Sequence, residues 1–509
     1  MITKTYCAAV NGLQVTTVTV EVSINKGVMY RFTGLGDAAV REGRDRIAAA
    51  LQHIGLQFPH GNIVVNLSPA NLRKEGSSFD LPIAIALLAA GGTIESARLH
   101  DIMLVGELGL DGRLQPVRGA LPIAIQARAE RFRALVVPKQ NEREAAVVNN
   151  LQVYGLSTLS DVIQLVTGQR TFSPTVVDTR QEFFQQQEAQ QGLDYADVRG
   201  QENVKRALEV AAAGGHNLLM IGPPGSGKSM MAKRLPTILP PLTLAESLET
   251  TQIHSVAGKL GHHVSLITQR PFRAPHHTIS EVALVGGGST PQPGEISLAH
   301  NGVLFCDELP EFSRTALEVL RQPLEDRHIT ISRARYSIDF PCSLMFVASM
   351  NPCPCGYYGD ATHRCTCSPG ERQRYRNRIS GPLLDRIDIQ CEIVPVAFGA
   401  LSEASPGEPS SVIRERVVKA RALQAERFRA EKGIFCNAQM TESMIRSYAT
   451  PDAQCLSLLR TAMERLRLSA RAYSRILKVA RTIADLEGSP HIAPPHIAEA
   501  VGYRRLDRL

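Results

Sequence analysis

The stretch NLLMIGPPGSGKSMMAKRL (217–235) decides the fold of the middle of this chain. An apolar strand, a glycine-rich turn and the start of a helix follow one another, the context in which a GxxxxGK[ST] match predicts a phosphate-binding loop. The pattern is met at Gly222, Pro223, Pro224, Gly225, Ser226, Gly227, Lys228 and Ser229. Its amides and helix N-terminus attract phosphates, and its lysine adds a full charge near the β and γ groups. We therefore predict a site for ATP and Mg²⁺, with Ser229 as a magnesium ligand.

A second apolar strand, NGVLFCDEL (301–309), ends in two adjacent carboxylates. This is the form expected of a Walker B strand, which lies beside the phosphate-loop strand. We predict that Asp307 holds magnesium through its hydration shell and that Glu308 orients or deprotonates the attacking water. As an alternative, an Asp-Glu pair after a strand often only begins a helix, where it balances the helix dipole.

Two more polar residues follow at strand or turn positions. CSLMFVASMNP (342–352) is a third apolar strand that ends at Asn351, a place suited to a second contact with the attacking water. A strand-end asparagine is otherwise a turn residue. SGPLLDRIDI (380–389) holds Arg386 between apolar residues and acids, and an arginine from a neighbouring subunit often meets the charge that develops in phosphoryl transfer. The alternative for Arg386 is a surface ion pair with one of the two nearby aspartates.

The chain divides into segments of different pattern. Strand and helix patterns alternate in the first segment, glutamines dominate the second, the third alternates around the nucleotide motifs, and the fourth is helical almost throughout. We predict an N-terminal α/β domain, a linker, a P-loop α/β core with a parallel sheet, and a C-terminal α-helical lid. The respective bounds are 1–166, 167–193, 194–397 and 398–509. Within them we expect strands at 16–24 and 62–69, and helices at 40–55, 80–92 and 468–488.

Composition places the chain among ordinary globular proteins. It has 509 residues, of which 44% are apolar and 21% charged, and no apolar run is long enough to span a bilayer. The N-terminal MITKTYCAAVNGLQ lacks the apolar core of a secretory signal, so we expect a cytoplasmic protein with reduced thiols. The formal net charge of +7 permits a polyanionic partner without requiring one.

The segment NPCPCGYYGDATHRCTCSPG carries two CxC pairs: Cys353, Cys355, Cys365 and Cys367. Four thiolates so close together predict a tetrahedral zinc site, which would be structural because four ligands leave no open position for catalysis. The familiar spacing is CxxC, and His363 is an alternative ligand. Free thiols or a redox switch are the competing interpretations.

Several segments together resemble the magnesium-chelatase-like AAA+ proteins of the ComM/YifB family. They are DVRGQ, GPPGSGKS, FRAPHHTISEVALVGGGSTPQPGEISLAHNGVLFCDEL, ASMNPCPCG and GPLLDRIDI, and the resemblance runs from the N-terminus to the last helices. It implies Asn351 as sensor 1, Arg386 as a finger acting in trans, and a lid arginine as sensor 2. Arg471 matches that last position better than Arg475. It also implies a hexameric ring that migrates single-stranded and branched DNA during homologous recombination and natural transformation.

Two segments of the central region are candidates for contact with DNA. RHITISRARYSIDF (327–340) alternates as a β-hairpin does, with Arg333 and Arg335 at its expected tip, where they would contact phosphates. An exposed hairpin with solvated charges is the alternative. The glycine-rich stretch 282–299 is a second candidate pore element, or else a plain surface loop.

The N-terminal region resembles the Lon-type protease domain in outline. In that family a serine at the position of Ser78 is the nucleophile, and a lysine a few residues after a PxxG turn is its base. Here the turn is 116–119 and the matching position holds Leu121, which cannot accept a proton. We therefore expect a noncatalytic relative that serves ring assembly or DNA contact, unless Lys74 or Arg73 supplies the missing base.

Two functions of different class are compatible with these motifs. The first is an ATPase that acts as a DNA helicase or translocase, for which DNA should stimulate ATP turnover. The second is an ATP-driven protein or chelatase-type remodeller that does not act on DNA. An ATP-dependent protease is disfavoured by Leu121.

Overall fold

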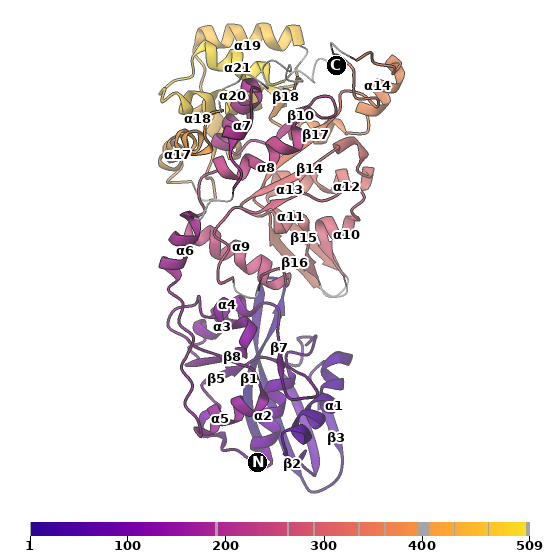
Figure 1. The fold of residues 1–509 in the computed structure, drawn as a ribbon, viewed down its shortest axis with the longest axis vertical. Coiled ribbons are helices and arrows are strands. Elements are labelled where there is room, and N and C mark those ends of the chain that lie inside the picture. Colours follow the sequence, from indigo (N-terminus) through magenta and orange to yellow (C-terminus); the bar gives the residue numbers. More distant parts are fainter. Residues whose placement is uncertain are drawn as a thin grey trace.

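The protein is elongated, with two sheets stacked along its length and a group of helices at one end (Figure 1). The computed structural model describes residues 2–188, 192–261, 264–288, 291–333, 336–360, 363–394, 407–431, 433–466 and 468–504. None of the described helices is both long and apolar enough to cross a membrane. The predicted fold class, an α/β protein with a parallel sheet and C-terminal helices, is confirmed.

The N-terminal region is a seven-stranded mixed sheet in the order β3-β4-β2-β1-β5-β8-β9. Its strands are β1 (Ile2–Asn11), β2 (Gln14–Asn25), β3 (Tyr30–Thr33), β4 (Asn62–Ser68), β5 (Ile102–Leu104), β8 (Ala134–Pro138) and β9 (Gln152–Leu156). A short pair, β6 (Glu107–Leu108) and β7 (Leu114–Gln115), lies outside that sheet. Its helices are α1 (Ala38–His53), α2 (Asp80–Ala90), α3 (Ala120–Ala129), α4 (Glu142–Ala145) and α5 (Leu159–Thr167). The strands and helices predicted here match β2, β4, α1 and α2 to within two residues at each end.

The glutamine-rich segment predicted as a linker contains a helix, α6 (Thr179–Glu188). Asp178 accepts a hydrogen bond from the amide of Gln181 and so caps the start of this helix. Glu182 accepts one hydrogen bond from Arg143 of the N-terminal region (2.6 Å) and another from Ser265 of the central region. The segment is therefore anchored to both regions that it connects.

The central region is a five-stranded parallel sheet in the order β11-β14-β17-β10-β18. The strands are β11 (Phe272–Arg273), β14 (Val303–Cys306), β17 (Met345–Met350), β10 (Leu218–Ile221) and β18 (Ile389–Glu392). Its longer helices are α7 (Glu202–Gly214), α8 (Lys228–Ile238), α9 (Leu244–Val256) and α14 (Pro369–Arg376). The carboxyl ends of parallel strands lie on the same side of the sheet, so the segments that follow β10, β14 and β17 meet there.

Shorter elements follow β11 and β14. They are α10 (Glu281–Val285), β12 (Gly286–Gly287), β13 (Gln292–Pro293), α11 (Glu295–Leu298), α12 (Arg314–Val319), α13 (Arg321–Asp326) and α15 (Gly381–Leu384). A β-hairpin, β15 (His328–Arg333) and β16 (Tyr336–Pro341), extends from α13. Ile331, Ile338 and Phe340 of this hairpin are buried in the same hydrophobic core as the inner residues of β14 and β17.

The C-terminal helices are α17 (Ser410–Arg427), α18 (Glu442–Tyr448), α19 (Ala453–Leu466), α20 (Ala470–Leu486) and α21 (Pro494–Gly502). Apolar residues of α20, among them Ile476, Leu477 and Ile483, are buried, and this helix packs with α17 against α7 of the central region. Buried Asp485 binds Arg427 and Arg481, which leaves the charges of this core paired.

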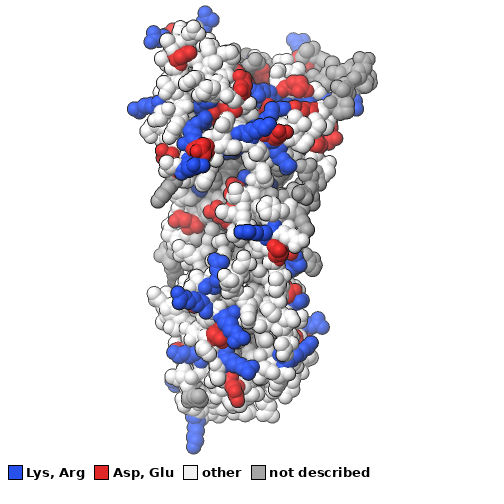
Figure 2. Space-filling model, turned by 90° about the vertical axis from the view of Figure 1, so that its left-hand side faces the viewer, with Lys and Arg blue, Asp and Glu red and all other residues white. Residues whose placement is uncertain are grey.

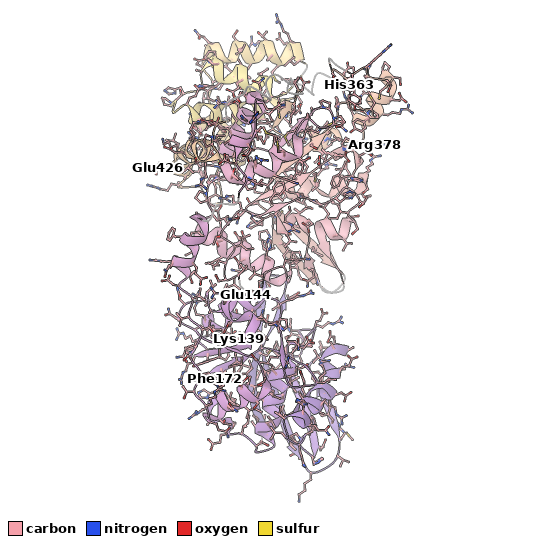
Figure 3. The ribbon with its side chains drawn as sticks, viewed as in Figure 1. Lys139, Glu144, Phe172, His363, Arg378 and Glu426 are labelled. Atoms are coloured by element: carbon pink, nitrogen blue, oxygen red, sulfur yellow. The ribbon has the colours of Figure 1, made fainter. Side chains whose placement is uncertain are left out.

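The N-terminal and central regions are in direct contact with each other. At α9, the side chain of Ser255 donates to Glu144, which is buried and lies at the junction of the two regions (Figure 3). At the turn between β1 and β2, a Cβ atom on Gly12 would lie 2.3 Å from Cγ2 of Ile338 in the β15–β16 hairpin. The hairpin is thus supported by the N-terminal sheet.

Candidate nucleotide site

The phosphate loop connects β10 to α8, and Lys228 is the first residue of that helix. Gly225 and Gly227 have φ values of 75° and 89°, a conformation that favours glycine. The ammonium of Lys228 is buried and donates to the carbonyls of Gly222 (2.7 Å) and Pro223 (2.8 Å). Burial lowers its pKa, against the attraction of the carboxylates that follow β14. The loop therefore holds a desolvated cation where phosphate oxygens would be received.

Ser229 and Asp307 contact each other directly. The hydroxyl of Ser229 donates to Oδ2 of Asp307 (2.6 Å), and Ser349 donates to Oδ1 of the same carboxylate. Oxygen donors are what Mg²⁺ prefers in proteins, so this hydroxyl and carboxylate fit the predicted ion. Ser349 has no counterpart in the sequence motifs. It lies on β17 beside β14, and only the register of the two strands reveals it.

Glu308 and Asn351 follow two neighbouring strands, β14 and β17. Asn351 follows β17, next to β10, and its Oδ1 accepts a hydrogen bond from Lys228 (3.2 Å). Glu308 has φ 53° and ψ 51°, a left-handed conformation that turns the chain at the end of β14. Its side chain is 53% exposed, and His277 of the β11 side lies 3.9 Å from its carboxylate. His277 is a second residue that the motifs did not single out.

The arginines predicted to act on the nucleotide lie together, but away from Lys228. Arg386, Arg471 and Arg475 line one pocket of about 340 Å³ between the central region and the C-terminal helices. The pocket also contains Asn217, which precedes β10, whereas the phosphate loop follows β10. At about 3.3 Å per residue, positions 217 and 222 are roughly 17 Å apart along the strand. The pocket therefore lies at the amino ends of the parallel strands, and the phosphate loop lies at their carboxyl ends.

The ion pairs within this pocket differ from the predicted alternative. Arg386 pairs with Glu325 of α13, not with Asp385 or Asp388. Those two aspartates instead pair with the arginines of α20: Arg471 with Asp385 and Arg475 with Asp388. Burial disfavours the Asp388 carboxylate, but Arg475 and His216 outweigh it, so that its pKa is lowered. Arg475 is thereby fixed to a buried charge, whereas the side chain of Arg471 is 68% exposed.

The thiols of Cys353, Cys355, Cys365 and Cys367 all lie within 4.8 Å of one another. Three of their sulfur pairs are 3.3, 3.7 and 3.6 Å apart. Four sulfurs at 2.3 Å from zinc would be about 3.8 Å apart at tetrahedral angles, so the donor set fits this ion. Hydrogen bonds from backbone amides, first that of Tyr357, lower the pKa of Cys355 to about 5, which favours the thiolate that a metal requires.

The cysteine cluster, as we call these four residues, touches the phosphate loop. A Cβ on Gly356 would lie 2.6 Å from Cδ of Pro224, so the backbone of Gly356 lies close against the ring of Pro224. His363, the alternative ligand, stacks on Tyr357 with ring centroids 4.8 Å apart and is 64% exposed (Figure 3). It lies outside the group of ligand atoms that the described residues bring together.

The predicted DNA-contact segments are structured differently from each other. Residues 328–333 and 336–341 pair as the two strands of the predicted hairpin, with Arg333 opposite Tyr336. Arg335, like the side chain of Arg333, lies outside what the structure describes. The described part of the glycine-rich stretch is not a single loop: it forms α10, the β12–β13 pair and α11. Leu284 and Ile296 of this stretch are buried in the hydrophobic core of the central region, which stabilises these elements.

The lysine and arginine near Ser78 have other partners. Lys74 is fully buried, and its ammonium donates to the carbonyls of Leu67 (2.9 Å) and Pro69. Arg73 pairs with Glu75 at 3.0 Å. Leu121 is buried in α3, in the hydrophobic core of this region. Both side chains that could replace the missing base are therefore engaged by groups other than Ser78.

The comparisons with known proteins cover the whole chain. Three families match: magnesium chelatase subunit ChlI at residues 194–401, subunit ChlI of Mg-chelatase at 20–141, and the subunit ChlI C-terminal family at 407–504. Competence protein ComM of Haemophilus influenzae is 46% identical over 507 residues, which are 99% of this chain and 97% of that protein. The uncharacterized protein YifB of Escherichia coli is 43% identical over 501 residues, 98% of this chain and 96% of its own.

A more distant similarity covers a smaller part of the chain. Lon protease 2 of Bacillus subtilis is 30% identical over 157 residues, which are 28% of this chain and 27% of the protease. The predicted resemblance to Lon is therefore confirmed for a part of the chain.

Proposed function

Because the chain belongs to the ComM/YifB family of magnesium-chelatase-like AAA+ proteins, we propose that it is an ATP-hydrolysing motor that moves DNA. The observation that carries the ATPase proposal is the convergence of Lys228, Ser229, Asp307 and Asn351 at one edge of the sheet. The DNA proposal rests on the similarity to a competence protein over nearly the full length. Its process would be branch migration in homologous recombination and natural transformation.

The residues at the carboxyl ends of these strands have different roles in ATP hydrolysis. Lys228 exchanges the carbonyls of its own loop for the β- and γ-phosphate oxygens, while the loop amides hold the phosphate chain. Ser229 and Asp307 would hold Mg²⁺, which neutralises phosphate charge when bound. Glu308, half exposed, orients the attacking water and accepts its proton, and Asn351 positions that water from the β17 side.

The arginines on the opposite edge serve a different subunit. They are separated from their own phosphate loop by the length of β10, so Arg386 and Arg471 would meet the nucleotide of a neighbouring copy. The arginines of each subunit then complete the nucleotide site of the next subunit. Such a head-to-tail contact generates a ring when it closes. We propose a homo-oligomeric ring, a hexamer in line with the family resemblance, in which an isolated subunit hydrolyses ATP poorly.

DNA would be contacted at the β15–β16 hairpin through Arg333 and Arg335. The charge distribution elsewhere supports a local contact: on the face shown in Figure 2, basic and acidic side chains are mixed along the length of the molecule. The net charge of the chain is only +7. If each subunit of a ring contributes one hairpin, the hairpins together can supply the positive charge that contacts the DNA phosphates. The cysteine cluster would hold structural Zn²⁺ beside the phosphate loop.

The test is ATP turnover of the full chain, with and without single-stranded, double-stranded and branched DNA. We expect stimulation, greatest with branched DNA, and unwinding of a forked substrate. A mixture of Lys228→Ala and Arg386→Ala chains supplies the control for the ring. Mixed rings contain some interfaces with both residues intact, so the mixture should recover part of the activity that each variant lacks alone.

The second candidate is an ATP-driven protein or chelatase-type remodeller, which the name of the matching family favours. It predicts the same ATPase and the same recovery in mixtures, but neither DNA binding nor stimulation by DNA. Stimulation by none of the three DNAs would therefore decide for the remodeller.

A further inference from the structure

Arginines are concentrated on α14 and in the segment just before it, beside the cysteine cluster. Residues 353–378 contain five arginines, two acids and no lysine. Three of these arginines, Arg372, Arg374 and Arg376, belong to α14 itself. A guanidinium binds a phosphate through two parallel hydrogen bonds, which an ammonium cannot do. The composition of this segment therefore fits a partner that carries phosphates.

Two of the arginines lie over the same aromatic ring. The guanidinium carbon of Arg372 is 4.0 Å from the ring centroid of Tyr358, and that of Arg376 is 6.0 Å from it. Tyr358 is 40% exposed, so part of its ring is accessible. Proteins hold single-stranded nucleic acid with this combination, because an aromatic ring stacks on a base while cations contact the phosphates beside it.

The two guanidinium groups lack a carboxylate that would balance their charge. Neither forms an ion pair with an acid that the structure describes, and the buried Nε of Arg376 has no hydrogen-bond partner among those residues. Burial lowers the pKa of Arg376, and the charge of Arg372 lowers it further. Like charges four positions apart on a helix destabilise it, so an anion bound between these two arginines would stabilise the surface.

The surroundings of α14 hold this surface in place. Ser368 caps the helix and exchanges hydrogen bonds with Glu371, and Tyr375 is buried in the hydrophobic core. Arg378, just beyond the helix, donates to Glu311 at 2.8 Å, in the segment that follows β14. A ligand therefore meets a surface that needs little reorganisation. In Figure 1, α14 and the β15–β16 hairpin both lie on the right-hand side of the molecule.

We propose that Tyr358, Arg372 and Arg376 form a second DNA contact, which holds a single strand at a distance from the hairpin. Tyr358 stacks on an unpaired base, and the two arginines bind the phosphates on either side of that base. This inference rests on the proposed function, because it assigns a further surface to the same DNA. The competing occupant is an acidic surface of a second copy of this chain, which the arginines would bind without any need for the tyrosine ring.

Three variants of the full chain separate the parts of this contact. Arg372→Ala/Arg376→Ala removes both cations, Tyr358→Leu removes the ring but keeps an apolar side chain, and Tyr358→Phe keeps the ring. The matched control is Arg460→Ala/Arg465→Ala, which removes two exposed arginines from α19. Fluorescence anisotropy measures the Kd for a single-stranded oligonucleotide and for the duplex of the same sequence, each at several salt concentrations.

We expect the double variant of α14 to lose about 1.4 from the log–log salt slope for the single strand, which is about 0.7 for each phosphate contact. Tyr358→Leu should weaken single-strand binding by about fivefold or more, the low end of what one stacked base contributes. Its effect on the duplex should be smaller, because paired bases are not available to the ring. Tyr358→Phe and the α19 control should bind both DNAs as the parental chain does.

Thermal unfolding and analytical ultracentrifugation of the same variants distinguish a DNA contact from a structural one. If the double variant of α14 unfolds at a lower temperature than the parental chain, the comparison of Tyr358→Leu with Tyr358→Phe still decides. Equal binding of the single strand by these two variants would overturn the proposal. A smaller oligomer of the double variant with a parental salt slope would also overturn it, and would assign the surface to a second copy.

The proposed function fails on a different result. If the parental chain binds none of the DNAs, the DNA motor is refuted, and this contact is refuted with it. If the parental chain binds DNA and the variants at Tyr358, Arg372 and Arg376 bind it with the same affinity and salt slope, only this contact is refuted.

Discussion

The contact between Gly356 and Pro224 makes a sharp prediction about the cysteine cluster. A Cβ on Gly356 would lie 2.6 Å from Cδ and 2.9 Å from Cγ of Pro224 in the phosphate loop. In Gly356→Ala the proline must move by about 0.8 Å to regain an ordinary contact of 3.4 Å. Because Pro224 belongs to the loop that we propose binds the phosphates, we expect nucleotide affinity to fall.

The magnitude follows from two terms. An extra methyl in a well-packed contact costs about 1–3 kcal/mol, which corresponds to roughly 5- to 140-fold in the Kd for nucleotide. Gly356 also has φ +87°, and a left-handed conformation costs an alanine about 1–2 kcal/mol more. That second term lowers overall stability but does not act on the loop.

Gly359 separates the two terms. Its φ is +86°, so alanine is strained there to the same degree, yet nothing lies within 4 Å of the position of its Cβ. Thermal unfolding of both variants measures the shared strain, and titration with a fluorescent ATP analogue measures the affinity. Gly356→Ala should bind nucleotide more weakly than Gly359→Ala. Equal affinities would refute the idea that the cysteine cluster supports the phosphate loop.

Four further predictions concern single groups. Lys228→Ala removes two charge-assisted hydrogen bonds to phosphate and should weaken ATP binding by about 10²- to 10⁴-fold in a binding titration; parental affinity would end the motor interpretation. Glu308→Gln should keep ATP affinity while turnover falls about 10²- to 10⁴-fold, and a parental rate would remove Glu308 from its role. Elemental analysis should find about one zinc per chain on the cysteine cluster, and chelation should lower the melting temperature; absence of metal contradicts the site. Replacing Arg333 and Arg335 by alanine should weaken DNA binding and reduce its log–log salt slope by about two, whereas unchanged affinity would place the contact elsewhere.

Local patterns in the sequence were sufficient for the fold. The apolar run before Gly222 and the helix after Lys228 predicted β10 and α8, and alternation of strands with helices predicted a parallel sheet. The cysteine spacing likewise predicted a cluster that the structure brings together. Each of these depends on residues close in sequence, whose conformations follow from periodicity and turn chemistry.

The contacts that the sequence did not predict depend on how segments far apart in the chain pair with one another. Ser349 is one apolar-strand residue among several, and it reaches Asp307 only because β14 and β17 pair in a particular register. His277 belongs to a recognisable string, but its contact with Glu308 crosses from β11 to β14. The sequence did not predict α6, because this polar segment has no helical stripe of apolar residues. The helix is stabilised by the hydrogen bonds that Glu182 accepts from the N-terminal and central regions.

The placement of the arginines gives the strongest argument for a ring. Arg386 precedes β18, and Arg471 is the second residue of α20. Both lie near the amino ends of the parallel strands, whereas Lys228 and Asn351 lie at the carboxyl ends. No side-chain rotation carries an arginine across the roughly 17 Å that five strand residues span. If these arginines meet a γ-phosphate, that phosphate belongs to another copy. Each subunit then carries two unlike half-sites on opposite edges, and only a closed head-to-tail assembly uses all of them.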